Sequence, residues 1–202
     1  MQMLSFDRHS LTQKLATLGL RHKVAFAGAC CERMLPSYKA FANEAGWGDF
    51  TRLRSAVDRV WELVDGVALE FEELTELISS CRLVVPDLDE ITVPLATWGQ
   101  DAASTVIHTL FCARDVSDEQ AALAATMCHQ AVDAFVQIHE NLDPNDPLLE
   151  QRINEHPLMK RELNAQADVL SLLRTSKIMT NELALRVRHH WQNKGLSNID
   201  LG

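Results

Sequence analysis

Apolar residues recur every three to four positions along most of this chain, which is the spacing of one face of an α-helix. The clearest example is the segment 50–65, whose apolar face consists of Leu53, Val57, Val60, Trp61 and Val64. Asp49 can cap the start of this segment through its carboxylate, and Gly66 can end it in a left-handed conformation. A helix is therefore predicted over residues 50–65.

Caps, glycines and prolines divide the chain before this segment. Gly19 is expected to end, in a left-handed conformation, a first helix that begins near Ser5. Because proline disfavours a helical residue before it, a second helix over 21–35 is predicted to stop at Pro36. Pro36 can itself open a short third helix that runs to about Ala45.

The rest of the chain continues in the same manner. A helix is predicted over 69–80, and the segment 81–93 follows it. Residues 83–85 could form a short strand, but the chain offers no second strand to pair with it, so the segment is predicted as a loop. Pro94 opens the next helix, and Ser117–Gln120 is a capping box for the one after it. Residues 158–194 contain neither proline nor glycine, so one long C-terminal helix is predicted there.

These elements predict an all-α fold, a single compact bundle of seven to nine helices with a long C-terminal helix, in one domain over residues 1–202. No apolar run reaches the length of about 20 residues that a membrane span needs. Scattered charges in Met1–Arg21 argue against a secretory signal, and an odd number of cysteines, five, favours reduced thiols. A cytoplasmic location is therefore expected.

The charge of the chain is negative overall and unevenly distributed. A formal net charge of −9 disfavours non-specific binding to nucleic acid. Residues 58–90 hold ten acidic residues against two arginines, whereas residues 177–194 hold four basic residues against one acidic residue. Two interpretations stay open: solvated surfaces of opposite charge, or a charge-matched contact with a second copy or with another protein.

Motifs that identify several enzyme classes are missing. The chain has no P-loop, dinucleotide fingerprint, nucleophile elbow or zinc-protease motif, so no cofactor is expected. His108 and Cys112 lie four positions apart, and Cys128 and His129 follow on the next predicted helix, an arrangement that zinc accepts. Cys128 also continues an apolar stripe, and cysteine is commonly buried without a ligand role. Core packing is therefore preferred, and no metal is expected.

A charged pair interrupts the small, apolar second helix. Glu32 and Arg33 place opposite charges at the end of a segment that is otherwise suited to the interior, so both need partners. Tyr38, Asp49 and Glu62 are the candidates. One interpretation is a paired network that fixes how the helices meet. The other is a polar pocket that binds a ligand, or in which Glu32 or Glu62 has a raised pKa and performs acid–base chemistry.

Several short segments, in order, resemble one bacterial family. The first are Cys31-Glu32-Arg33-Met34-x-Pro36-x-Tyr38, Gly46-x-Gly48-Asp49 and Trp61-Glu62. The later ones are Gln100-Asp101-Ala102-Ala103, His156-Pro157-Leu158-Met159 with Glu162 and Gln166, and Ser197-Asn198-Ile199. They resemble the YjaG family, known as domain of unknown function 416. The resemblance spans about residues 20–199, with a departure at Asp200, where glycine is expected. It implies an all-helical cytoplasmic protein of proteobacteria and no assigned activity.

Two functions follow as hypotheses. The first is a non-catalytic binding or assembly protein that acts through protein–protein contacts, either as a homodimer or with an unidentified protein partner. The alternative is an enzyme or small-molecule binder with a polar pocket. The candidate binding residues of that pocket are Glu32, Arg33, Tyr38, Asp49, Trp61, Glu62 and Asp101.

Overall fold

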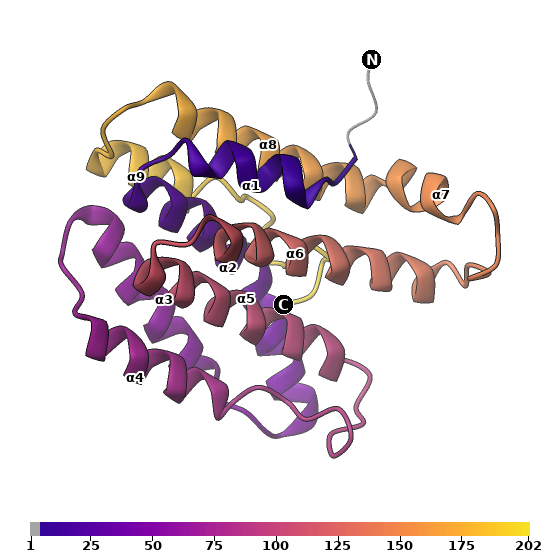
Figure 1. The fold of residues 1–202 in the computed structure, drawn as a ribbon. Coiled ribbons are helices and arrows are strands. Elements are labelled where there is room, and N and C mark those ends of the chain that lie inside the picture. The colour runs from indigo at the N-terminus through magenta and orange to yellow at the C-terminus, as the bar shows by residue number, and fades with distance from the viewer. Residues whose placement is uncertain (1–4) are drawn as a thin grey trace.

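The computed structural model of the protein describes residues 5–202 and places nine α-helices, and no strand, within them (Figure 1). The predicted all-α bundle is confirmed, whereas the expectation about an N-terminal signal includes residues 1–4, which lie outside the described part. The helices are α1 (Arg8–Ala16), α2 (Leu20–Ala45), α3 (Phe50–Asp65), α4 (Phe71–Arg82), α5 (Ala96–Asp115), α6 (Asp118–His139), α7 (Leu149–Glu155), α8 (Pro157–Thr175) and α9 (Asn181–Arg188).

Helix α2 is the centre of the bundle and packs against α3, α5, α6, α8 and α9 (Figure 1). Small residues in its first half allow this close approach, because a larger side chain would push the neighbouring helices away. At Gly28, for example, a Cβ atom would lie only 3.2 Å from the indole ring of Trp61. The sequence pattern of small apolar residues therefore marks the most crowded helix of the protein.

Pro36 does not end this helix, contrary to the prediction. α2 continues through it to Ala45, so the two helices predicted on either side of Pro36 are one. The carbonyl of Arg33, in the turn before the proline, accepts the backbone N–H of Asn198 at 3.1 Å. A proline can remain inside a helix where other parts of the protein supply hydrogen bonds to the disturbed turn.

The long C-terminal helix predicted over residues 158–194 is also wrong. The chain leaves the helical conformation at Ser176, whose φ of −119° and ψ of 131° are extended, and α9 begins after Thr180. The carbonyl of Ser176 lies 3.1 Å from Nε2 of His22, and the Thr180 hydroxyl accepts the N–H of Leu183 at 3.2 Å. The segment therefore forms two separate helices with different neighbours, because α8 packs against α6 and α9 packs against α3.

Most predictions that rest on neighbouring residues are confirmed. Asp49 caps α3 by accepting the N–H of Arg52 at 3.0 Å, and Gly66 ends that helix with a φ of 107°. Ser117 caps α6 in the same way. Gly19 is an exception: its φ is −72°, and it is the N-cap of α2 rather than a left-handed end of α1.

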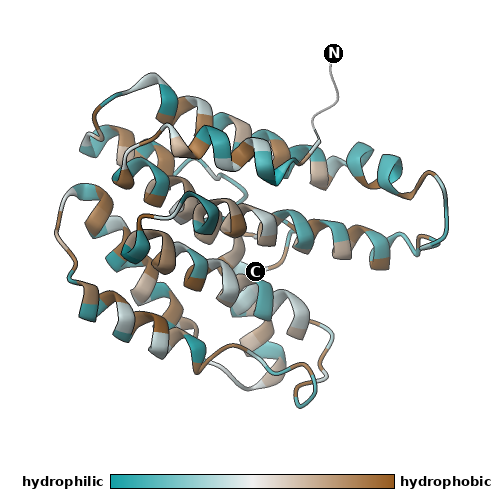
Figure 2. Ribbon diagram, viewed as in Figure 1, coloured by the Kyte–Doolittle hydropathy of each residue, from teal (hydrophilic) through white to brown (hydrophobic). Residues whose placement is uncertain are grey.

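The interior of the bundle is apolar, and hydrophilic residues dominate peripheral elements such as α7 (Figure 2). All five cysteines are buried free thiols. Among residues 5–202, no helix combines the length and the hydrophobicity that crossing a membrane would require.

Candidate functional site

The structure distributes the seven predicted site residues over several places. Glu32 and Trp61 lie together where α2, α3 and α9 meet, and Arg33 points away from them into the interior. Tyr38 and Asp49 share a third place, at the turn between α2 and α3. Glu62 and Asp101 lie elsewhere, and a single pocket containing all seven is therefore not present in the described part of the chain.

Glu32 belongs to a partly exposed charge network. Its carboxylate accepts two hydrogen bonds from Arg54, at 2.7 and 3.0 Å, and one from the indole Nε1 of Trp61 at 2.9 Å. Arg188 of α9 lies 3.4 Å from the same carboxylate. Asp58 completes the network, because it pairs with Arg54 at 2.9 Å and with Arg188 at 2.6 Å. These contacts tie α9 to α2 and α3.

This network also accounts for part of the uneven charge. Arg188 comes from the basic segment 177–194, and Asp58 comes from the acidic segment 58–90. The two segments therefore meet within one chain at this point. A contact between two copies is not needed to bring these particular charges together.

Arg33 and Glu162 form an ion pair in the interior, with side chains that are 1% and 0% exposed. The guanidinium donates to both carboxylate oxygens, at 3.0 and 2.9 Å, and to the carbonyl of Ala29 at 3.0 Å. Burial opposes the positive charge, but attraction to Glu162 outweighs it, and the pKa of Arg33 is raised as a result. A bidentate pair of this geometry is among the strongest that side chains make.

The side-chain amides of Gln166 and Asn198 donate further hydrogen bonds to Glu162. The Nε2 atom of Gln166 donates to Glu162 at 2.8 Å and to the carbonyl of Ala125 at 3.2 Å. The Nδ2 atom of Asn198 donates to Glu162 at 3.3 Å and to the carbonyl of Cys128 at 3.0 Å. The network therefore connects α2, α6, α8 and the C-terminal segment.

Two thiols border the same network. Cys30 accepts a hydrogen bond from Arg33 at 3.3 Å, and the Cys128 thiol lies 3.8 Å from the Cys30 carbonyl. A hydrogen bond from Cys128, helped by the charge of Arg33, lowers the pKa of Cys30, whereas burial raises the pKa of Cys128. Both sulfur atoms are shielded from solvent, so the pair stabilises the interior rather than presenting a reactive thiolate.

Three segments that carry the family resemblance converge in this network. Arg33 belongs to the first motif, Glu162 and Gln166 to the segment that starts at His156, and Asn198 to the last motif. Arg33 is one of the predicted site residues, whereas its three partners Glu162, Gln166 and Asn198 are not. Their occurrence in the segments that carry the family resemblance is the signal that could have identified them.

The remaining predicted residues have local structural contacts. Tyr38 donates to the carbonyl of Val84 at 2.7 Å and accepts the N–H of Asp49 at 3.3 Å, which fixes the turn before α3. Glu62 is exposed and pairs with Arg59. Burial alone raises the pKa of Asp101, on α5, to about 6.

The four residues weighed as zinc ligands occupy different surroundings. His108 Nδ1 lies 2.7 Å from the side-chain oxygen of Gln120, and Cys112 is buried. The ring of His129 stacks on Phe6 with centroids 4.7 Å apart. Within residues 5–202, no group of three or more His, Cys, Asp or Glu side chains has an arrangement that could hold a metal ion.

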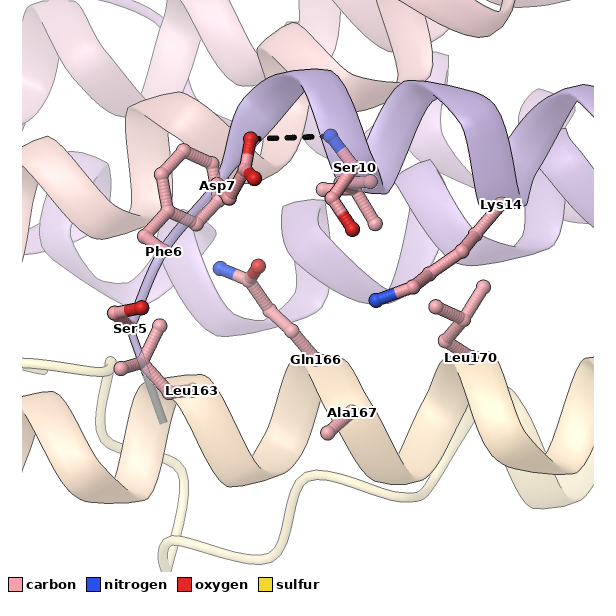
Figure 3. A pocket seen from close by; sticks show the side chains of 10 residues that line it. Ser5, Phe6, Asp7, Ser10, Lys14, Leu163, Gln166, Ala167 and Leu170 are labelled. Carbon is pink, nitrogen blue, oxygen red and sulfur yellow. Dashed lines mark hydrogen bonds between the residues drawn. The ribbon is translucent and has the colours of Figure 1, made fainter. Parts of the chain in front are cut away.

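Four of the surface cavities in the described part of the chain are lined by residues other than the seven predicted ones. The most enclosed lies between α1 and α8 and has a volume of about 140 Å³ (Figure 3). Gln166, which also belongs to the buried network, forms part of its wall. A larger, more open groove of about 530 Å³ lies between α8 and residues 190–193.

Comparison with known proteins places these observations in a family. Residues 10–202 match the family described as "Protein of unknown function (DUF416)". An uncharacterized protein of Haemophilus influenzae is 24% identical over 198 residues, which cover 96% of this chain and 97% of the relative. The uncharacterized protein YjaG of Escherichia coli is 24% identical over 180 residues, which cover 88% of this chain and 89% of YjaG.

A solved structure shows the same fold. The crystal structure of a DUF416 family protein from Shewanella baltica superposes with a TM-score of 0.85, at 21% identity, over 95% of this chain and 97% of that one. The match over nearly the whole length agrees with the order of the resembling segments and with the helical bundle. The chain is therefore a member of the DUF416 family of proteins of unknown function.

Proposed function

We propose that this protein is a non-catalytic binding or assembly protein that acts through protein–protein contacts. The observation that carries the proposal is a partly exposed strip of aromatic rings and guanidinium groups on α4 and α5. This α4–α5 strip consists of Phe71, Arg82, Phe111 and Arg114.

The members of the strip touch one another. The guanidinium carbon of Arg114 lies 5.1 Å from the ring centre of Phe71 and 4.8 Å from that of Phe111, and Arg82 lies 5.5 Å from Phe111. Phe71 is 57% exposed. Aromatic residues and arginine are enriched at protein interfaces and supply most of the binding energy there, so their contiguity on one surface favours a contact site.

The surroundings of the strip indicate the chemistry of its partner. Helix α4 lies at the edge of the bundle and carries the exposed acidic side chains Glu70, Glu72 and Glu76 at or near its first turns (Figure 1). A partner with an apolar centre and basic residues around it would complement this surface.

The contacts of the two carboxylates predicted for acid–base chemistry support a non-catalytic role. Glu32 pairs with Arg54, and Glu62 pairs with Arg59 on the surface. The alternative of an enzyme with one pocket around these residues therefore has weaker support.

Site-specific photocrosslinking in the host cell tests the proposal. A photoreactive phenylalanine analogue replaces Phe71 in one variant and Ile138, which is 69% exposed on another part of the surface, in the control. We expect a discrete protein adduct from position 71 and none of the same mass from position 138. An adduct of twice the chain mass would identify the partner as a second copy. The absence of an adduct at position 71, or the same adduct from both positions, would contradict the proposal.

A further inference from the structure

The cavity between α1 and α8 has the size of a small organic molecule. Its volume is about 140 Å³. A cavity of about 150 Å³ in another protein holds benzene, which has six non-hydrogen atoms, so this one suits a ligand of roughly that size. The cavity opens to solvent on one side, and such a ligand can therefore enter without unfolding of the bundle.

Polar groups reach into this cavity from both helices. Figure 3 shows Gln166 rising from α8 and Lys14 extending from α1 into the same space, with Asp7 and Ser10 beside them. Gln166 is buried, and its amide nitrogen is occupied by Glu162 and by the Ala125 carbonyl. The amide orientation is therefore fixed, and its oxygen is the acceptor that remains for a ligand.

The two charged groups of the cavity have opposite signs and come from the N-cap and the last turn of α1. One oxygen of Asp7 caps the helix by accepting the N–H of Ser10 at 3.1 Å, and its second oxygen can accept a further hydrogen bond. Lys14 lies in the last turn of the helix, and its side chain extends back toward Gln166 (Figure 3). A ligand beside Gln166 therefore meets a negative and a positive group.

The floor of the cavity is apolar. Side chains of α8 form this floor, and Phe6 and Leu11 add apolar surface from the other side. The α8 side chains are Leu163, Ala167 and Leu170. A fitting ligand therefore combines two opposite charges with a short aliphatic body.

We propose that this cavity binds a small aliphatic α-amino acid. The ammonium group donates to Asp7 and to the amide oxygen of Gln166, and the carboxylate accepts from Lys14. The aliphatic side chain packs against the apolar floor on α8. Alanine and valine, with about six to eight non-hydrogen atoms, have the size that the cavity volume allows. This binding site is independent of the α4–α5 strip.

Titration calorimetry with L-valine tests the proposal, with two compounds of the same carbon skeleton as comparators. Isobutylamine lacks the carboxylate, and isovalerate lacks the ammonium group. We expect saturable binding of valine and affinities at least about tenfold lower for each comparator. Absence of saturable binding of both valine and alanine up to about 10 mM, or equal binding of the comparators, would overturn the proposal.

Two variants test which side chain of the cavity binds each charged group of the ligand. Asn is also a good helix cap, so Asp7→Asn removes the negative charge while α1 keeps its start. This variant should lose at least about tenfold in affinity for valine and leave isovalerate unaffected. Lys14→Gln should weaken the binding of valine by a similar factor and leave the affinity for isobutylamine unchanged. Lys39→Gln, an exposed lysine on α2, is the control and should bind valine as the wild type does. Equal loss in the Lys39 variant would overturn the assignment, and circular dichroism verifies that each variant is folded.

Discussion

Glu32 and Arg33 are neighbours on α2, yet their side chains enter two different charge networks. Arg33 and Glu162 are fully buried, and each is satisfied by one opposite charge together with neutral hydrogen-bonding groups. Glu32 is 18% exposed and shares two arginines with Asp58 at the rim of the bundle. In the interior, removal of one partner leaves a charge with no access to water, whereas at the rim water and the remaining charges compensate.

The largest expected effect is at the centre of the buried network. Glu162→Gln leaves Arg33 charged and without a counterion in the interior, so we expect the free energy of unfolding to fall by about 3–5 kcal/mol. Urea denaturation followed by circular dichroism measures this. Replacing both members by methionine should recover most of the loss, because a well-packed apolar pair needs no counterion.

Glu155→Gln, on the exposed surface of α7, is the matched control and should change the free energy of unfolding by less than about 0.5 kcal/mol. A similarly small effect of Glu162→Gln would remove the distinction between the two networks.

Asp101 extends the comparison of the two charge networks, because its carboxyl group is largely buried and, unlike Glu162, has no positive partner within residues 5–202 that stabilises its ionised form. Its pKa is raised to about 6 by burial, so the folded protein holds the proton more tightly than the unfolded chain does. The contribution of Asp101 to stability therefore increases as the pH falls from about 6 to about 4, and ionisation destabilises the fold at pH 7. Asp101→Asn should raise the free energy of unfolding at pH 7 by about 1–2 kcal/mol.

Denaturation curves at pH 7 and pH 4.5 provide the check for Asp101. The gain from Asp101→Asn should shrink at the lower pH, because the wild-type carboxyl is then protonated. A variant that is less stable at pH 7 than the wild type would show that the carboxylate has a stabilising partner.

At the rim, the effect of losing a charge should be smaller. Glu32→Gln retains an acceptor for Trp61, and Asp58 still neutralises Arg54 and Arg188. We expect a loss of about 1 kcal/mol, which decreases further at high salt because these charges are partly exposed. Thermal or urea unfolding at two salt concentrations measures it. A loss as large as that of Glu162→Gln would mean that exposure does not set the difference.

The smallest effect is expected at Asp200, which is connected to the buried network through the C-terminal segment. Its φ is 61°, in the left-handed region that glycine tolerates best, and its carboxylate bonds to Arg161 at 2.7 Å. Asp200→Gly relieves the backbone strain and loses two partly exposed contacts, the ion pair with Arg161 and the hydrogen bond from Asn193, so the net change should stay within about 0.5 kcal/mol. Asp200→Ala keeps the strain and loses the pair, and should cost about 1 kcal/mol. Equal stabilities of the two variants would show that the strain is negligible.

The accuracy of the sequence predictions depended on the range of the interactions involved. The helix over 50–65 was predicted with the bounds of α3, because Asp49 and Gly66 act on adjacent turns. The predicted helix end at Pro36 and the predicted helix through Ser176 were wrong. At these places the backbone contacts distant residues, Asn198 near Pro36 and His22 at Ser176. Such contacts join residues more than one hundred positions apart and leave no local periodicity.

The same limit applied to the candidate site. The need of Glu32 and Arg33 for partners was evident from two charges at the end of an apolar helix. Their actual partners, Arg54, Arg188 and Glu162, could not be selected, because many exposed residues of the correct charge are present in the chain. The candidates Tyr38 and Asp49 do meet, but they meet each other at a turn.

The amino-acid sequence by itself determined that this protein is a helical bundle, where most of its helices begin, and which helix is packed most closely. These properties follow from side-chain periodicity and from caps that act over one turn. Only the tertiary structure decided that α2 continues through its proline, that the C-terminal segment is divided, and that Arg33 pairs with Glu162. Those outcomes depend on which distant groups meet in the interior, where an unpaired charge or hydrogen-bonding group costs more free energy than a helix boundary.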